Sequence, residues 1–253
     1  MFSTWLKAVK NVLFPLLCLY CGNKIFKGHL CLKCEEKINF LRSPACRCCA
    51  EPGALNIAGL CKKCIDKAFS YQQAISVTAY KEPMISLIYL FKYKNCGWLT
   101  EFFTSLIIKH LSKIGFNPAE YSVVTAVPMH KYKLKLRGYN QAELLAKSLS
   151  NYFKIPFKND IIRSINAKSS QTKLSQRERR KNVEKTFTVK ENLQNKKIIL
   201  VDDIFTTGAT VQACCRELKK CQAGAVTVLT LAKTIHSCSR RRVKSENIKE
   251  LHS

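Results

Sequence analysis

Residues 198–210 read IILVDDIFTTGAT, and the rest of the chain is best interpreted from them. The first four residues form a continuous apolar run, which is typical of a strand buried on both faces of a sheet. Two adjacent carboxylates, Asp202 and Asp203, follow at the carboxyl end of that strand. A small, hydroxyl-rich loop comes next, and apolar residues at helical spacing then predict a helix that ends near Gly224. A second apolar run at 225–231 predicts the next parallel strand.

This strand–loop–helix pattern indicates a site for a sugar phosphate. Ligands of open α/β sheets bind just beyond the carboxyl ends of the strands. The N–H groups of a small-residue loop and the start of a helix favour a phosphate there. Two carboxylates would repel that phosphate, so we expect Asp202 and Asp203 to accept hydrogen bonds from ribose hydroxyls, with Mg²⁺ as a possible bridge. The predicted phosphate contacts are Thr206, Thr207, Gly208, Ala209 and Thr210.

The stretch lacks the Gly-Lys-Ser/Thr of a Walker A loop and is not a GxGxxG motif. It closely resembles the phosphoribosyl-pyrophosphate (PRPP) motif of type I phosphoribosyltransferases, over all thirteen positions. In that family the acidic pair holds the ribose hydroxyls and the loop holds the 5′-phosphate. The alternative interpretation is a strand–turn–helix in which the aspartates only cap the helix.

The composition indicates a globular protein with an acidic partner. The chain has 253 residues, of which 47% are apolar, so it can form a proper core and is not disordered throughout. It has 43 Lys and Arg against 17 Asp and Glu, a net charge of +26. A PRPP site needs only a few of these charges, so we expect nucleic acid, an anionic membrane surface or a polyanionic substrate as a partner.

Four Cys-x-x-Cys pairs lie within the first 64 residues and predict two structural zinc sites. Each pair presents two thiolates to one tetrahedral ion, and two pairs complete a closed Cys₄ site. Pairing in sequence order gives two ribbons, and spacing alone also allows an interleaved cross-brace. Cys48 is an extra cysteine that can replace a neighbour. The predicted ligands are Cys18, Cys21, Cys31, Cys34, Cys46, Cys49, Cys61 and Cys64.

The N-terminus and the cysteines favour a cytoplasmic protein. The apolar run from Val12 to Cys21 is short, contains Pro15 and lacks a small-residue cleavage site, so we do not expect a signal peptide. No other segment is long enough to span a bilayer. Zinc is therefore expected instead of disulfides, and peripheral membrane association stays open.

We place a domain boundary near residue 70. The predicted domains are a double zinc ribbon at 1–70, an α/β domain at 71–235 and a basic, unstructured tail at 236–253. Strands are expected at 74–80, 123–128 and 157–165, and helices at 83–91, 98–111 and 141–153.

Two basic segments accompany the PRPP motif. The segment at 129–141, MHKYKLKLRGYNQ, is predicted as a basic loop at the end of its strand, and Lys131 and Arg137 are candidates for the pyrophosphate. Asn140 or Gln141 is expected to cap the helix that follows. The segment at 166–181 is polar and cationic and is predicted as a mobile loop over the site. Its candidate contacts for substrate or DNA are Lys173, Arg177, Arg179 and Arg180.

The whole chain resembles the ComF family, which is associated with natural competence. The resemblance rests on FPLLCLYCG, the paired cysteines, AVPMHKYKLKLRGYNQA, QTKLSQRERRKNV and VDDIFTTGAT. It implies a double zinc ribbon joined to a type I phosphoribosyltransferase fold, an open and mostly parallel sheet flanked by helices. It also implies the handling of single-stranded DNA during transformation, together with other DNA-uptake proteins.

Two functions are compatible with these motifs. In the first, the protein binds PRPP with Mg²⁺ while its basic surface holds single-stranded DNA. In the second, it is an active phosphoribosyltransferase that moves phosphoribosyl to an acceptor and releases pyrophosphate. We favour the first, because we recognise no pocket for an acceptor base in the sequence. The acceptor, the oligomeric state and the protein partners do not follow from the residues.

Overall fold

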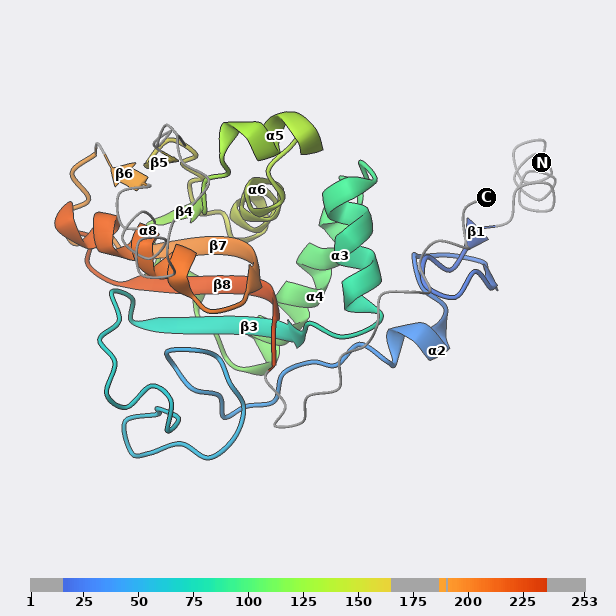
Figure 1. Ribbon diagram of the computed structural model, residues 1–253, viewed down its shortest axis with the longest axis horizontal. Helices are drawn as coiled ribbons and strands as arrows, with labels where there is room; N and C mark the ends of the chain where they lie inside the picture. The colour runs from blue at the N-terminus through green and yellow to red at the C-terminus, as the bar shows by residue number, and fades with distance from the viewer. Residues whose placement is uncertain (1–15, 165–186, 190, 236–253) are drawn as a thin grey trace, which may run out of the picture.

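The computed structural model describes residues 16–164, 187–189 and 191–235 (Figure 1). A four-stranded sheet with the strand order β3–β8–β7–β4 lies at its centre, and all neighbouring strands are parallel. The strands are β3 (Gln73–Ala79), β8 (Val226–Lys233), β7 (Ile198–Phe205) and β4 (Val123–Ala126). The predicted α/β fold with a parallel sheet is confirmed.

Helices cover both faces of the sheet. On one face, Ile199 and Val201 of β7 share a core with α3, α4 and α6, and on the other, Ile198 and Leu200 pack with α8. Burial on both faces explains why the run at 198–201 has no polar residue. The helices are α3 (Met84–Tyr93), α4 (Leu99–Lys113), α6 (Gln141–Phe153) and α8 (Ala209–Lys220).

The smaller elements differ in part from the predictions. The strand expected at 157–165 is only β5, which pairs antiparallel with β6 outside the central sheet. Helix α8 ends at Lys220, before the predicted Gly224. Gly224 instead packs against Asn195, whose carbonyl oxygen would lie 2.7 Å from a Cβ at position 224. The remaining elements are β1 (Leu16–Leu17), β2 (Lys24–Ile25), α2 (Leu32–Glu35), the 3₁₀ turn η1 (Pro118–Glu120), α5 (Lys131–Arg137), β5 (Ile162–Ser164) and β6 (Phe187–Val189).

The cysteine-rich part of the chain packs on the sheet domain at two places. The first ribbon, residues 16–38, contributes Cys18, Leu30 and Cys34 to the core that contains α3 and α4. The second ribbon, residues 45–64, lies by the opposite face, beyond β3 in Figure 1. There the Tyr71 hydroxyl donates a hydrogen bond to the carbonyl oxygen of Cys48 (2.7 Å).

The segment between the two ribbons covers the open edge of β3. Phe40 pairs antiparallel with Thr78, and the Leu41 N–H donates to the carbonyl oxygen of Val77 (2.9 Å). An exposed strand edge is a template for aggregation, so this cover protects the sheet. Among the described helices, none has both the length and the apolar composition needed to cross a membrane.

Candidate functional site

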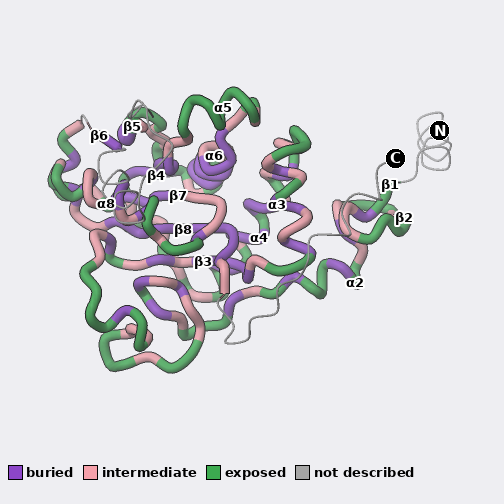
Figure 2. Tube along the Cα trace, viewed as in Figure 1, coloured by how far each residue is buried: buried purple, intermediate pink, exposed green. Residues whose placement is uncertain are grey.

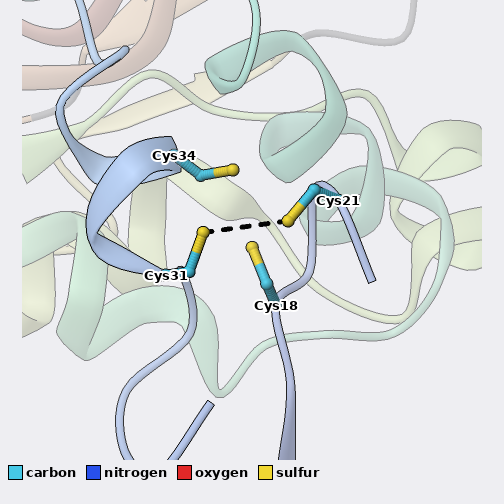
Figure 3. A group of neighbouring side chains, drawn as sticks. All are labelled: Cys18, Cys21, Cys31 and Cys34. Carbon is cyan, nitrogen blue, oxygen red and sulfur yellow. Dashed lines mark hydrogen bonds between the residues drawn. The ribbon is translucent and has the colours of Figure 1, made fainter. Parts of the chain in front are cut away.

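Each ribbon brings four cysteines together. Within each group the four Sγ atoms lie within 4.8 Å of one another. Figure 3 shows the first group, in which the Sγ atoms of Cys21 and Cys31 are 3.7 Å apart. Four sulfurs around a tetrahedral zinc ion, each about 2.3 Å from the metal, lie about 3.8 Å from one another. Both groups therefore fit structural zinc, and their members are Cys18, Cys21, Cys31 and Cys34, then Cys46, Cys49, Cys61 and Cys64.

The cysteines are paired in sequence order, which makes two ribbons and not a cross-brace. Cys48 lies outside the second group. Its side chain is buried, and this burial raises the pKa of its thiol. Cys46 and Cys49, which were chosen by their spacing, occupy the group instead.

The acidic pair lies at the carboxyl end of the central strand. Strand β7 continues past the predicted end at Val201 to Phe205, because Asp202, Ile204 and Phe205 stay in register with β8. The Asp203 N–H donates to Oδ1 of Asp202 (2.8 Å). The ammonium of Lys92, at the end of α3, lies 2.6 Å from Oδ2 of Asp203, and both side chains are largely buried.

Lys92 is a site residue that the sequence analysis missed. Among the described residues its ion pair is with Asp203, and none is found for Asp202. Burial of the Asp202 carboxyl, and then the negative charge of Asp203, raise the pKa of Asp202 to about 8. The Asp203 N–H already donates to this carboxyl, and a bound cation or a set of hydroxyl donors would stabilise its ionised form further.

The loop after the acidic pair is a tight turn in which position 208 accommodates only glycine. Gly208 has φ +77° and begins α8, and a Cβ there would lie 2.7 Å from the ring of Phe205. The hydroxyl of Thr207 accepts a hydrogen bond from the Ala209 N–H (3.3 Å). Thr206, Thr207, Ala209 and Thr210 are exposed, so this loop is open to a ligand.

The second ribbon contacts the ends of β8 and, through Lys233, of β7 next to this loop. Lys233, at the end of β8, is only 3% exposed. Its ammonium lies 5.1 Å from the centroid of the Phe205 ring and 3.3 Å from Oε2 of Glu51 in the second ribbon. A line of contacts thus runs from Glu51 through Lys233 and Phe205 to Gly208.

A cavity of about 290 Å³ opens beside the acidic pair. Asp202, Asp203 and Thr210 line it together with three cationic side chains, whereas the predicted contacts at 206–209 do not. Those cations are Lys92 from α3 and Lys133 and Arg137 from α5. The predicted Arg137 lines the cavity, whereas the predicted Lys131 does not, and Lys133 lines it instead.

The segment predicted as a basic loop at 129–141 forms the short helix α5. The side chain of His130 caps this helix by accepting a hydrogen bond at Nδ1 from the Tyr132 N–H (3.2 Å). Gly138 ends it in the left-handed conformation, with φ +78°. The expectation of a loop was wrong, because a histidine cap and a glycine stop enclose one helical stretch.

The residues after α5 fasten it to the sheet domain. Asn140 caps α6 by accepting from the Ala142 N–H (3.1 Å) and donates Nδ2 to the carbonyl oxygen of Val127 (3.0 Å), at the end of β4. Gln141 and Tyr139 both donate to the carbonyl oxygen of Phe91 in α3, at 3.1 and 2.6 Å. The Arg-Gly-Tyr-Asn-Gln run therefore positions the cavity walls.

Two models of known domains match parts of this chain. Residues 9–68 match the double zinc ribbon domain, and residues 140–251 match the phosphoribosyl transferase domain. Competence protein F of Haemophilus influenzae is 29% identical over 227 residues, covering 87% of this chain and 98% of that protein. The chain is a homologue of competence protein F over most of its length.

Two further homologues match this chain over the same share of its length. Competence protein ComFC of Bacillus subtilis is 27% identical over 240 residues, covering 87% of this chain and 95% of that protein. DNA utilization protein YhgH of Escherichia coli K12 is 26% identical over 227 residues, covering 87% and 98%. The sheet domain has the type I phosphoribosyltransferase fold. Four predicted contact residues and the predicted tail at 236–253 lie outside the described residues. The four are Lys173, Arg177, Arg179 and Arg180.

The cysteine groups lead to a prediction of metal content. We expect the purified protein to contain about two zinc ions per chain. Cys49→Ser removes a ligand of the second group and should lower the content to about one, whereas Cys48→Ser should leave it unchanged. Elemental analysis of dialysed protein measures this. A zinc content near zero in the wild type, or equal losses in the two variants, would contradict the assignment.

The pKa of Asp202 leads to a prediction of stability against pH. A pKa raised by folding means that the folded state holds the proton more tightly, so the contribution of Asp202 to wild-type stability is highest below pH 4 and falls as pH rises toward 8. Asp202→Asn removes this loss, and its advantage over wild type should grow between pH 4 and 8 by up to roughly 1.4 kcal/mol per pH unit, then level off. Urea unfolding at several pH values measures the difference.

The matched control is Asp203→Asn, which leaves Lys92 without its ion-pair partner. That variant should be less stable than wild type at neutral pH. A constant stability difference between Asp202→Asn and wild type from pH 4 to 9 would refute the raised pKa.

Proposed function

We propose that this protein binds PRPP with Mg²⁺ at the cavity beside β7, and that it handles single-stranded DNA in natural competence. The observation that carries the proposal is the composition of the cavity wall. Asp202 and Asp203 line it together with Lys92, Lys133 and Arg137, and Thr210 lines it at the start of α8, just after the exposed glycine-closed loop. A sugar with phosphates at two positions complements this mixture of charges.

Each part of PRPP has a partner among these residues. Asp202 and Asp203 accept hydrogen bonds from the ribose hydroxyls. The N–H groups and hydroxyls at 206–210 donate to the 5′-phosphate at the start of α8, which is twelve residues long. Lys133 and Arg137 face the pyrophosphate, and Mg²⁺, when bound, neutralises part of its charge.

Arg137 is supported in this role by its surroundings. Its guanidinium donates to the Tyr93 hydroxyl (3.1 Å) and to Oε1 of Gln141 (3.4 Å). These contacts hold its long side chain near one position, which lowers the entropy cost of binding an anion. Lys92 neutralises Asp203, so the acidic pair repels the pyrophosphate less.

The DNA part of the proposal rests on relatives and on charge. The similar proteins are named for competence and for DNA utilization. A net charge of +26 exceeds what a PRPP site requires and suits contacts with phosphates along a nucleic-acid backbone.

PRPP with Mg²⁺ should raise the melting temperature of the wild type. At a ligand concentration 100 times the Kd the stabilisation is about 2.7 kcal/mol, a rise of roughly 5–10 °C for a domain of this size. Asp202→Ala/Asp203→Ala should abolish the rise, because the ribose hydroxyls lose their acceptors. Differential scanning fluorimetry with and without the ligand measures both proteins.

The control for this experiment is Glu120→Ala/Glu191→Ala. It removes two carboxylates that also pair with lysines, but at the surface away from the cavity. The control should respond to PRPP like the wild type. An equal rise in the Asp202→Ala/Asp203→Ala variant would remove the acidic pair from the site.

A further inference from the structure

Helix α5 leaves its apolar side chains in solvent. None of its seven residues is buried. Tyr132 is 66% exposed and Leu136 is 69% exposed, with Leu134 between them at 40%. Figure 2 shows α5 as a largely exposed segment at the upper edge of the molecule. A surface helix normally buries its apolar side, so these residues need a partner outside the described chain.

Helix α3 continues this surface with two further tyrosines. Tyr89 and Tyr93 are 43% and 57% exposed, and their ring centroids lie 5.3 Å apart. Arg137 connects the helices, because its guanidinium lies 4.9 Å from the centroid of the Tyr93 ring and donates to the Tyr93 hydroxyl. We call this surface the tyrosine rim, and its residues are Tyr89, Tyr93, Tyr132, Leu134 and Leu136.

The two helices of the tyrosine rim carry cations and no acidic residue. Neither α3 nor α5 contains an Asp or a Glu. The cations on α5 are Lys131, Lys133, Lys135 and Arg137, which alternate with its apolar residues, and Lys92 lies between the two tyrosines of α3. The charge of this surface complements a polyanion, and its aromatic rings complement flat, apolar groups.

We propose that the tyrosine rim is the surface on which this protein binds single-stranded nucleic acid, with bases stacked on the tyrosines and phosphates paired with the lysines of α5. This inference rests on the proposed function, and it locates the contact with DNA on α3 and α5. Single strands combine unpaired bases with a backbone charge, and aromatic side chains among lysines recognise both at once.

The tyrosine rim lies next to the proposed PRPP cavity. Lys133 and Arg137 belong to α5 and also line the cavity wall, as does Lys92 of α3. A strand on the rim therefore passes the mouth of the cavity that holds the sugar phosphate. An anionic membrane would also meet the charge of the rim, but three of its five large side chains are tyrosines, which provide stacking faces more than aliphatic area.

The test measures the affinity of the full-length protein for a labelled oligothymidine by fluorescence anisotropy. Tyr89→Ala/Tyr132→Ala removes two stacking faces that do not line the cavity. The Kd should rise by about tenfold or more, since each stacked base contributes roughly a fivefold to hundredfold effect. Lys135→Gln should reduce the slope of log K against log salt by about 0.7, which corresponds to one phosphate contact.

Tyr152→Ala is the matched control. Tyr152 is 59% exposed, like the rim tyrosines, but it lies near the end of α6 next to Phe153. This variant should keep the wild-type affinity. All variants change exposed side chains, so their melting temperatures should match the wild type, and PRPP should still stabilise Tyr89→Ala/Tyr132→Ala.

The outcomes separate this inference from the proposed function. If the wild type binds the oligonucleotide and the rim variants keep its affinity and salt slope, the rim is not the DNA surface. If the rim variants bind DNA normally but lose binding to vesicles of phosphatidylserine and phosphatidylcholine, the rim is a membrane surface and the inference is overturned. If the wild type itself does not bind the oligonucleotide, the DNA part of the proposed function fails as well, while stabilisation by PRPP is unaffected.

Discussion

Two adjacent carboxylates at the end of a buried strand, one of them paired with Lys92, are the feature on which the candidate site depends. Asp202 and Asp203 reach this position because β7 is paired on both sides and stays in register to Phe205. Lys92 neutralises only Asp203. Burial of the Asp202 carboxyl, and then the negative charge of Asp203, raise the pKa of Asp202 and favour a ligand that brings hydroxyl donors or a metal ion.

The second ribbon is part of the structure that supports the candidate site. Glu51 pairs with the buried Lys233, whose ammonium lies against the ring of Phe205. That ring leaves no space for a side chain on Gly208, so the loop can approach a phosphate with its backbone. The fourth contact is Gln212 of α8, which accepts a hydrogen bond from the Ser70 N–H just after the ribbon (3.1 Å). The second ribbon, whose four cysteines fit a zinc ion, therefore supports the residues on both sides of the loop.

The sequence predicted the features that depend on local pattern. The apolar run at 198–201, the four Cys-x-x-Cys pairs and helix α6 at 141–153 are present as expected. It did not predict Lys92, because nothing in the local sequence of α3 marks this lysine, and its partner lies more than a hundred residues away. Helix α5 was also missed, since alternating lysines and apolar residues match neither a buried strand nor an amphipathic helix.

The most direct test of the central claim is the crystal structure of the protein soaked with PRPP and Mg²⁺. Our account predicts electron density in the cavity beside β7, with the ribose over Asp202 and Asp203 and the 5′-phosphate against residues 206–210. An empty cavity at saturating ligand, or a ligand bound away from the acidic pair, would contradict it.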